Sequence, residues 1–92
     1  MDLQELRQKI DGIDDEIIRL FQRRMDVSAE IAGYKKRRGL PVYDPEREKQ
    51  KLHELSQKAI DKYQPYIAEL YSLIFELSRA EQKKLINTEN EL

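Results

Sequence analysis

The chain has 92 residues, which is the size of one domain, and we expect residues 1–92 to form a single unit. Apolar residues make up 39% and charged residues 38% of it, a balance typical of an amphipathic helical protein. The 17 basic and 18 acidic side chains nearly cancel, which argues against a large electrostatic field that would attract nucleic acid or a membrane surface.

The absence of cysteine excludes disulfides and thiolate chemistry and favours a reducing compartment. With a single histidine as well, the sequence argues against a dedicated zinc site. No apolar run approaches the roughly 20 residues that a membrane-spanning helix needs. The first residues lack the basic and apolar segments of a signal peptide, so we expect a cytoplasmic protein.

The first predicted element is one long helix over residues 3–38, which Gly39 can close in the left-handed conformation. Apolar residues recur along it in steps of three and four, a heptad-like pattern, at positions 3, 6, 10, 13, 17, 20, 27, 31 and 34. Such a helix is about 54 Å long, whereas a 100-residue globule has a radius of gyration of about 13 Å. The helix should therefore project beyond a compact monomer and need a partner chain to cover its stripe.

Two further helices follow. Asp44 and Pro45 suit the N-cap and first position of a second helix, predicted over residues 45–62. Pro65 is suited to the first turn of a third helix, predicted over residues 65–87. The sequence thus predicts an all-α fold of three helices with a very long first helix.

Polar residues interrupt the apolar stripe of each predicted helix. In the first helix the seam passes through position 24, in the second the apolar spacing leads back to position 48, and in the third it continues through positions 78 and 82. These positions hold Arg24, Glu48, Ser78 and Gln82. A buried charge or amide is destabilising unless it is paired, so they indicate either a buried polar network or a ligand site.

Each of these residues alone also has a structural interpretation. Arg24 can be a snorkelling or register-setting side chain. Glu48 can complement the dipole of a first turn, and Asp44 is first of all an N-cap. Ser78 and Gln82 can be tolerated polar residues of an interface. On periodicity alone, both interpretations stay open.

Two more cations relate to Arg24 by helical geometry. Lys35 lies 11 residues after it, close to three turns, so the two side chains share a face about 16 Å apart and could hold a small anion between them. Arg7 lies 17 residues before Arg24, about 25 Å away and roughly 100° around the helix. Arg7 could reach the pocket of a partner in an antiparallel or crossed dimer.

Three segments together resemble the AroQ class of all-helical chorismate mutases: LRQKIDGIDDEIIRLFQRRMDVSAEIAGYK, DPERE and ELSRAEQ. The resemblance extends from Leu6 to about Gln82, and eight separated positions agree in residue type and order. It implies an intertwined homodimer of three-helix chains with two active sites, each taking residues from both long helices.

The resemblance also implies which residues bind the substrate, chorismate. Arg24 and Arg47 would hold its carboxylates within their own chain's site, with Ser78 assisting. Arg7 would bind a carboxylate in the partner's site. Arginine suits this role because its planar fork matches a carboxylate.

The remaining implied roles concern the reacting atoms. Lys35 and Gln82 would donate hydrogen bonds to the ether oxygen, where negative charge grows as the C–O bond breaks. Glu48, with Asp44 nearby, would accept a hydrogen bond from the ring hydroxyl.

The implied activity is that of an isomerase, the intramolecular [3,3] rearrangement of chorismate to prephenate in phenylalanine and tyrosine biosynthesis. This reaction needs conformational restraint rather than a nucleophile, metal or cofactor, so we expect none. Two alternatives remain: an isochorismate-pyruvate lyase of the same fold, and a non-catalytic helical module for dimerisation or regulation. The complete set of polar interruptions argues against the module.

Overall fold

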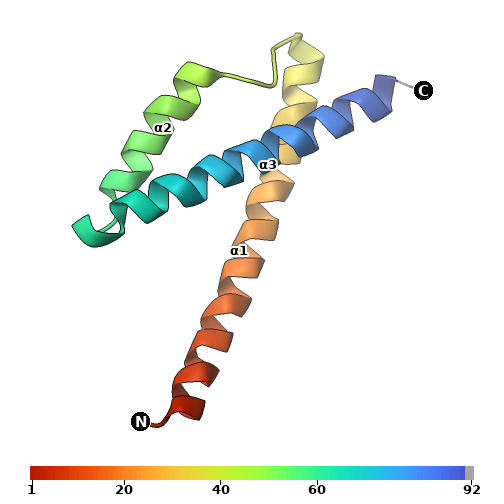
Figure 1. Ribbon diagram of the computed structural model, residues 1–92. Coiled ribbons are helices and arrows are strands. Elements are labelled where there is room, and N and C mark those ends of the chain that lie inside the picture. The colour runs from red at the N-terminus through yellow and green to blue at the C-terminus, as the bar shows by residue number, and fades with distance from the viewer. Residues whose placement is uncertain (91–92) are drawn as a thin grey trace.

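Three α-helices and one short 3-10 turn make up the part of the chain that the structure describes. The computed structural model describes the backbone of residues 1–90 and the side chains of residues 1–87. In chain order the elements are α1 (Leu3–Arg38), α2 (Pro45–Gln57), the 3-10 turn η1 (Asp61–Tyr63) and α3 (Gln64–Asn90) (Figure 1). Since the described residues contain no strand, the predicted all-α class with a long first helix is confirmed.

The long helix α1 has well-defined caps at both ends. The side chain of Asp2 accepts a hydrogen bond from the backbone N–H of Glu5 at 2.8 Å, which satisfies one of the free donors of the first turn. Gly39 takes the left-handed conformation with φ of 68°, as predicted, and its N–H bonds to the carbonyls of Lys35 and Lys36. The helix has the bounds expected from its sequence pattern.

The second helix is shorter than predicted, because α2 ends at Gln57 rather than near Lys62. The hydroxyl of Ser56 donates to the carbonyl of His53 at 2.9 Å, a local bond of the kind that competes with helix continuation. Ala59 then donates to the carbonyl of Ser56 in a tightened last turn. α3 begins at Gln64, directly after η1, and continues beyond its predicted end to Asn90.

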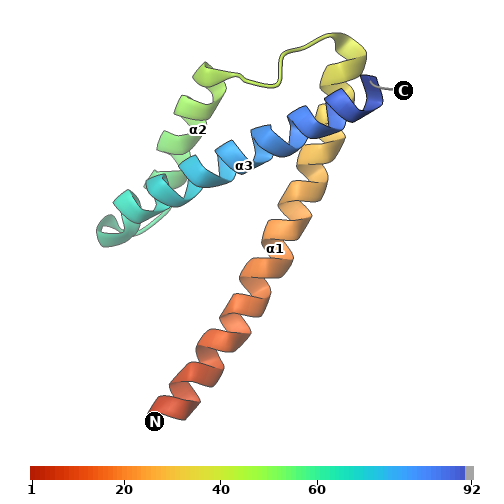
Figure 2. The same ribbon diagram turned by 45° about the vertical axis from the view of Figure 1, so that its right-hand side comes forward.

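The helices form an open, elongated arrangement. α2 runs to the η1 turn, and α3 returns from it to cross the C-terminal half of α1 (Figures 1 and 2). The N-terminal half of α1 projects away from both other helices in both views. The radius of gyration is 16.7 Å and the longest extent 56 Å, so the chain is much less compact than a globule of this length.

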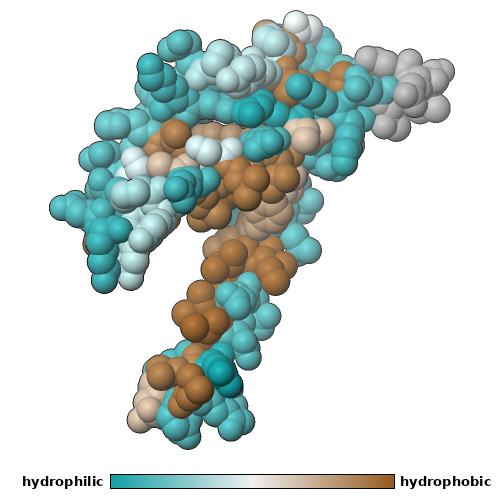
Figure 3. All heavy atoms as spheres, in the orientation of Figure 1, coloured by the Kyte–Doolittle hydropathy of each residue, from teal (hydrophilic) through white to brown (hydrophobic). Residues whose placement is uncertain are grey.

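The packed core is small and lies where α1 crosses α3. The buried side chains of the described residues are those of Ser28, Ala32, Phe75, Ser78 and Gln82. By contrast, the apolar stripe on the N-terminal half of α1 is 46–60% exposed, at Leu3, Leu6, Ile10, Ile13, Ile17 and Leu20. Apolar surface follows this half of α1 and the middle of α3 in Figure 3.

α3 contacts α1 through small residues. Ser28 and Ala32 are buried at the crossing, whereas Val27 and Ile31, one position earlier on the predicted seam, remain 49% and 45% exposed. Small side chains let the two helix backbones approach closely, so the chain's own contact lies beside the apolar seam rather than on it. No helix within residues 1–90 combines the length and apolarity required to cross a lipid bilayer.

Candidate active site

A cavity of about 500 Å³ lies between α1, the 39–44 connector, the start of α2 and the middle of α3. It is partly open to solvent and combines charged, polar and apolar side chains. The lining residues are Arg24, Val27, Ser28, Ile31, Lys35, Val42, Asp44, Arg47, Glu48, Lys51, Phe75, Ser78, Arg79 and Gln82.

The structure brings seven of the eight candidate residues together around this cavity. α1 contributes Arg24 and Lys35, the connector and α2 contribute Asp44, Arg47 and Glu48, and α3 contributes the two residues Ser78 and Gln82. The eighth, Arg7, does not line it. It lies on the projecting half of α1, 17 residues before Arg24 and therefore about 25 Å along the helix.

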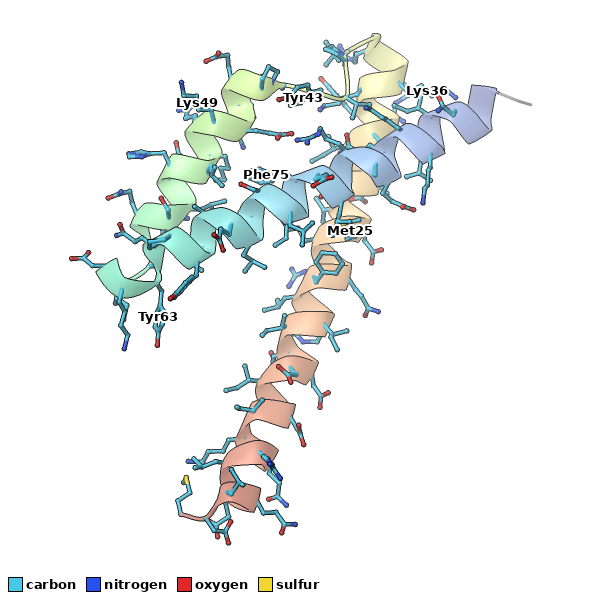
Figure 4. All side chains as sticks on the ribbon, viewed as in Figure 1. Met25, Lys36, Tyr43, Lys49, Tyr63 and Phe75 are labelled. Carbon is cyan, nitrogen blue, oxygen red and sulfur yellow. The ribbon has the colours of Figure 1, made fainter. Side chains whose placement is uncertain are left out.

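Arg24 is held in place at the crossing of α1 and α3. Its Nη1 donates to Oγ of Ser78 at 3.1 Å, and its guanidinium lies 5.5 Å from the ring centre of Phe75. The Ser78 hydroxyl in turn lies 3.6 Å from the sulfur of Met25. Met25 on α1 and Phe75 on α3 mark this crossing in Figure 4. These contacts fix the arginine side chain while its charge lines the cavity.

Gln82 is buried at the same crossing, one turn after Ser78 on α3, and bonds to Ser28. Its Nε2 donates to the backbone carbonyl of Ser28 at 3.1 Å and to the Ser28 hydroxyl at 2.8 Å. An amide nitrogen has two hydrogens, and these two bonds can use both of them. Donation from Gln82 to a ligand would then require the exchange of one of these bonds.

Lys35 crosses from α1 to the connector. Its Nζ donates to the backbone carbonyl of Val42 at 2.8 Å. A lysine ammonium has three hydrogens, so two of them remain for a ligand in the cavity. The contact also holds the connector over the site.

The first turn of α2 presents three candidate residues. The Asp44 side chain accepts from the backbone N–H of Arg47 at 3.1 Å, which is the N-cap bond that its sequence position predicts. Because Asp44 also lines the cavity, capping does not exclude a second role. The cap sets the direction of the turn that carries Arg47 and Glu48.

Glu48 is paired with an arginine on α3. Nη1 of Arg79 donates to Oε1 of Glu48 in an ion pair, and the side chains of Arg79 and Glu48 are 26% and 24% exposed. The guanidinium of Arg79 also stacks 4.7 Å from the ring centre of Tyr43, in the connector (labelled in Figure 4). Hydrogen bonding to Glu48 raises the pKa of Arg79 above its ordinary value, against an opposing effect of burial.

Sequence reasoning missed three polar residues of this cavity. Ser28 is small and lies beside the apolar stripe of α1, so it does not interrupt the stripe. Arg79 lies three residues before Gln82 and four after Phe75, a spacing that places all three on one face of α3 and could have identified it. Lys51 likewise follows Arg47 by four residues on α2.

The cavity carries an excess of positive charge. Five of its lining side chains are cationic, from Arg24, Lys35, Arg47, Lys51 and Arg79, whereas two are carboxylates, from Asp44 and Glu48. The cations surround the space from all three helices, so they can bind a small molecule with more than one negative group. In the described residues, no group of three or more His, Cys, Asp or Glu side chains is placed to hold a metal ion.

Comparison with known protein families gives a match over residues 6–83 to chorismate mutase type II. The chain belongs to this family. The match covers α2 completely, most of α1 and α3, and every candidate residue. It therefore confirms the resemblance drawn from the sequence segments.

Individual relatives agree with the family. The chain is 38% identical over 88 residues to a bifunctional chorismate mutase/prephenate dehydratase of Buchnera aphidicola, an alignment that covers 94% of the chain and 23% of that protein. It is 45% identical over 47 residues to a chorismate mutase of Methanocaldococcus jannaschii, covering 51% of the chain and 48% of the relative. A 4-amino-4-deoxychorismate mutase of Streptomyces venezuelae is 39% identical over 46 residues, covering 50% and 45%.

In each of these relatives the chain aligns with less than half of the protein's length. No solved structure matches the chain significantly. Nothing in the comparisons favours the lyase alternative.

Proposed function

We propose that this protein is a chorismate mutase, which rearranges chorismate to prephenate within one active site. One observation supports the proposal most strongly. In a chain that matches this family over residues 6–83, five cationic side chains surround a cavity of about 500 Å³. Chorismate has two carboxylates, a ring hydroxyl and an ether oxygen, and the cavity offers a group suited to each.

The first task of the site is to hold the flexible enolpyruvyl arm over the ring. Arg24 and Arg47 would each bind a carboxylate, and Ser78 would keep the guanidinium of Arg24 in place through the bond already present. Orientation of this kind can supply about 7–11 kcal/mol of a barrier when the reacting atoms are held in near-attack geometry.

The second task is to stabilise the charge that develops on the ether oxygen. Lys35 would donate with one of its two remaining hydrogens, and Gln82 would exchange its bond to the Ser28 hydroxyl for one to the substrate. Fixed donors at this point act more strongly on the transition state than on the ground state, and so raise the rate of the chemical step. Glu48, with Asp44 nearby, would accept from the ring hydroxyl.

The active unit would be a homodimer with shared sites. The stripe on the N-terminal half of α1 is exposed, while the core of a single chain holds few buried residues. A second copy of the chain would cover the stripe and bring its own Arg7 to the cavity, where the arginine would bind a substrate carboxylate. Without such a partner, an apolar face of this length would stay exposed to water and would favour aggregation.

The test is an assay of the purified protein with chorismate and, separately, with isochorismate. We expect the protein to form prephenate from chorismate. The Arg24→Ala variant, purified in the same way, should lose this activity and serves as the negative control. Pyruvate released from isochorismate would instead support the lyase, and turnover of neither substrate would support a non-catalytic module.

A further inference from the structure

The Glu48–Arg79 pair forms part of the cavity wall, and its geometry bears on which substrate the site accepts. Glu48 comes from α2 and Arg79 from α3, and both side chains line the cavity at about a quarter exposure. Arg79 is fixed on its other side by its stacking on Tyr43. The guanidinium therefore stays beside the carboxylate rather than extending into solvent.

The ion pair changes what Glu48 can bind. Arg79 donates to Oε1, which leaves Oε2 without this partner and able to accept a hydrogen bond from a ligand. An unpaired carboxylate in this position would attract an ammonium group more strongly than a hydroxyl. With Arg79 attached, the pair has no net charge, and a ligand cation beside Glu48 would also be close to the guanidinium.

A hydroxyl does not meet this obstacle. It is neutral and donates a single hydrogen bond, which Oε2 can accept while Oε1 keeps its arginine. An aliphatic amine, by contrast, is protonated at neutral pH and brings a positive charge into a cavity that already holds five cations and two carboxylates. Repulsion between like charges in a partly enclosed site is screened less than at the surface.

We propose that Arg79 is a specificity-determining residue that makes the site select a substrate with a ring hydroxyl over its counterpart with an amino group. This inference rests on the proposed function, since it assumes that the ring substituent faces Glu48. The amino counterpart is 4-amino-4-deoxychorismate, the compound in the printed name of the Streptomyces venezuelae relative.

The experiment compares kcat/KM for chorismate and for 4-amino-4-deoxychorismate in the full-length protein. In the wild type we expect a clear preference for chorismate. In Arg79→Gln, which removes the charge, the ratio of the two values should shift toward the amine by roughly tenfold or more, since tenfold corresponds to only about 1.4 kcal/mol. Arg79→Lys keeps the charge and should keep a ratio close to that of the wild type.

The matched control is Lys84→Gln, which removes one positive charge from α3 at a residue that does not line the cavity. Its ratio should equal that of the wild type. Circular dichroism of each variant checks that the helices are retained. Arg79→Met, which keeps the apolar stem, is the second charge-removing variant if Arg79→Gln does not fold.

Each outcome decides the proposal. A wild-type protein that converts the amine as well as it converts chorismate overturns it without any variant. Conversion of chorismate, together with an unchanged ratio in both charge-removing variants, overturns the role of Arg79 and leaves the proposed function standing. Turnover of neither compound by the wild type overturns both.

Discussion

The two halves of α1 continue one apolar repeat but lie in different surroundings. From Leu3 to Leu20 the stripe contains no polar residue, and it is exposed along its whole length. Beyond Leu20, Arg24 interrupts the repeat, and α3 packs beside it on Ser28 and Ala32. The uninterrupted half suits an interface with another chain, whereas the interrupted half forms a wall of the ligand cavity.

This contrast explains how a short chain can hold a large polar cavity. A single chain buries little apolar surface, because Ala32 and Phe75 are the buried apolar side chains of its described residues. If a second chain buries the N-terminal half of α1, that contact stabilises the fold. The C-terminal half can then place charged side chains around the cavity. Changes on the uninterrupted stripe should therefore affect the dimer, whereas changes around the cavity should affect catalysis.

The largest effect is expected from a charge placed on the uninterrupted stripe. Ile13→Asp would bury an unpaired carboxylate in the proposed interface of each chain, a change that costs roughly 3–5 kcal/mol per site. We expect sedimentation equilibrium to show loss of the dimer, and chemical denaturation to show a large loss of stability. Gln8→Asp adds the same charge to the opposite side of the helix and should leave the dimer intact. An unchanged mass for Ile13→Asp would refute the interface.

A change in the interrupted half should lower catalysis without dissociating the dimer. Lys35→Ala removes a donor to the ether oxygen, and loss of one comparable donor lowers kcat by roughly 100- to 1000-fold in other enzymes. Arg37→Ala removes a neighbouring cation of α1 that does not line the cavity and should retain activity. The measurement is the initial rate of chorismate consumption at saturation. Near-normal turnover of Lys35→Ala would rule out its assigned role.

A smaller effect, with a pH signature, is expected at Gln82. A glutamine amide donates at any ordinary pH, whereas a glutamate can donate only when protonated, and its ordinary pKa is about 4.3. The Gln82→Glu variant should therefore lose activity at neutral pH and recover it as the pH falls. The check is a pH profile of kcat/KM for the variant beside that of the wild type. A variant profile of the same shape as the wild type's would exclude contact with the ether oxygen.

The smallest effects are expected from alanine substitutions at the two N-cap residues, Asp2 and Asp44. Asp2 caps the projecting half of α1 and Asp44 caps α2 at the cavity, so alanine at either position should lower the free energy of unfolding by about 1 kcal/mol. Only the Asp44 variant should also lose activity. Asp44→Asn keeps a capping side chain and should restore stability, while activity stays below that of the wild type. Equal activity of the Asp2 and Asp44 alanine variants would mean that Asp44 acts only as a cap.

Much of the fold follows from local signals in the sequence. Gly39 and the Asp44–Pro45 pair mark helix ends because their backbone requirements are specific, and both occur as predicted. The end of α2 does not follow from such a signal, since the apolar spacing continues past Gln57 while a side-chain bond of Ser56 competes with the helix.

The candidate site was predictable where residues break a pattern. Arg24, Glu48, Ser78 and Gln82 stand out as polar residues on apolar stripes, and all four line one cavity. Arg79 does not stand out, because its importance depends on the approach of α2 to α3, which is a tertiary contact. The position of α3 on α1 also could not be predicted from the sequence, because Ser28 and Ala32 are not part of the apolar repeat of α1.

In the proposed dimer each cavity is completed by the other chain, and mixed dimers can test this arrangement. Arg7→Ala and Arg24→Ala chains carrying different affinity tags are each expected to be inactive alone. A purified heterodimer contains one site with both arginines and one site with neither, so it should regain roughly half of the wild-type activity. A heterodimer of confirmed composition that remains as inactive as its parents would contradict a shared site.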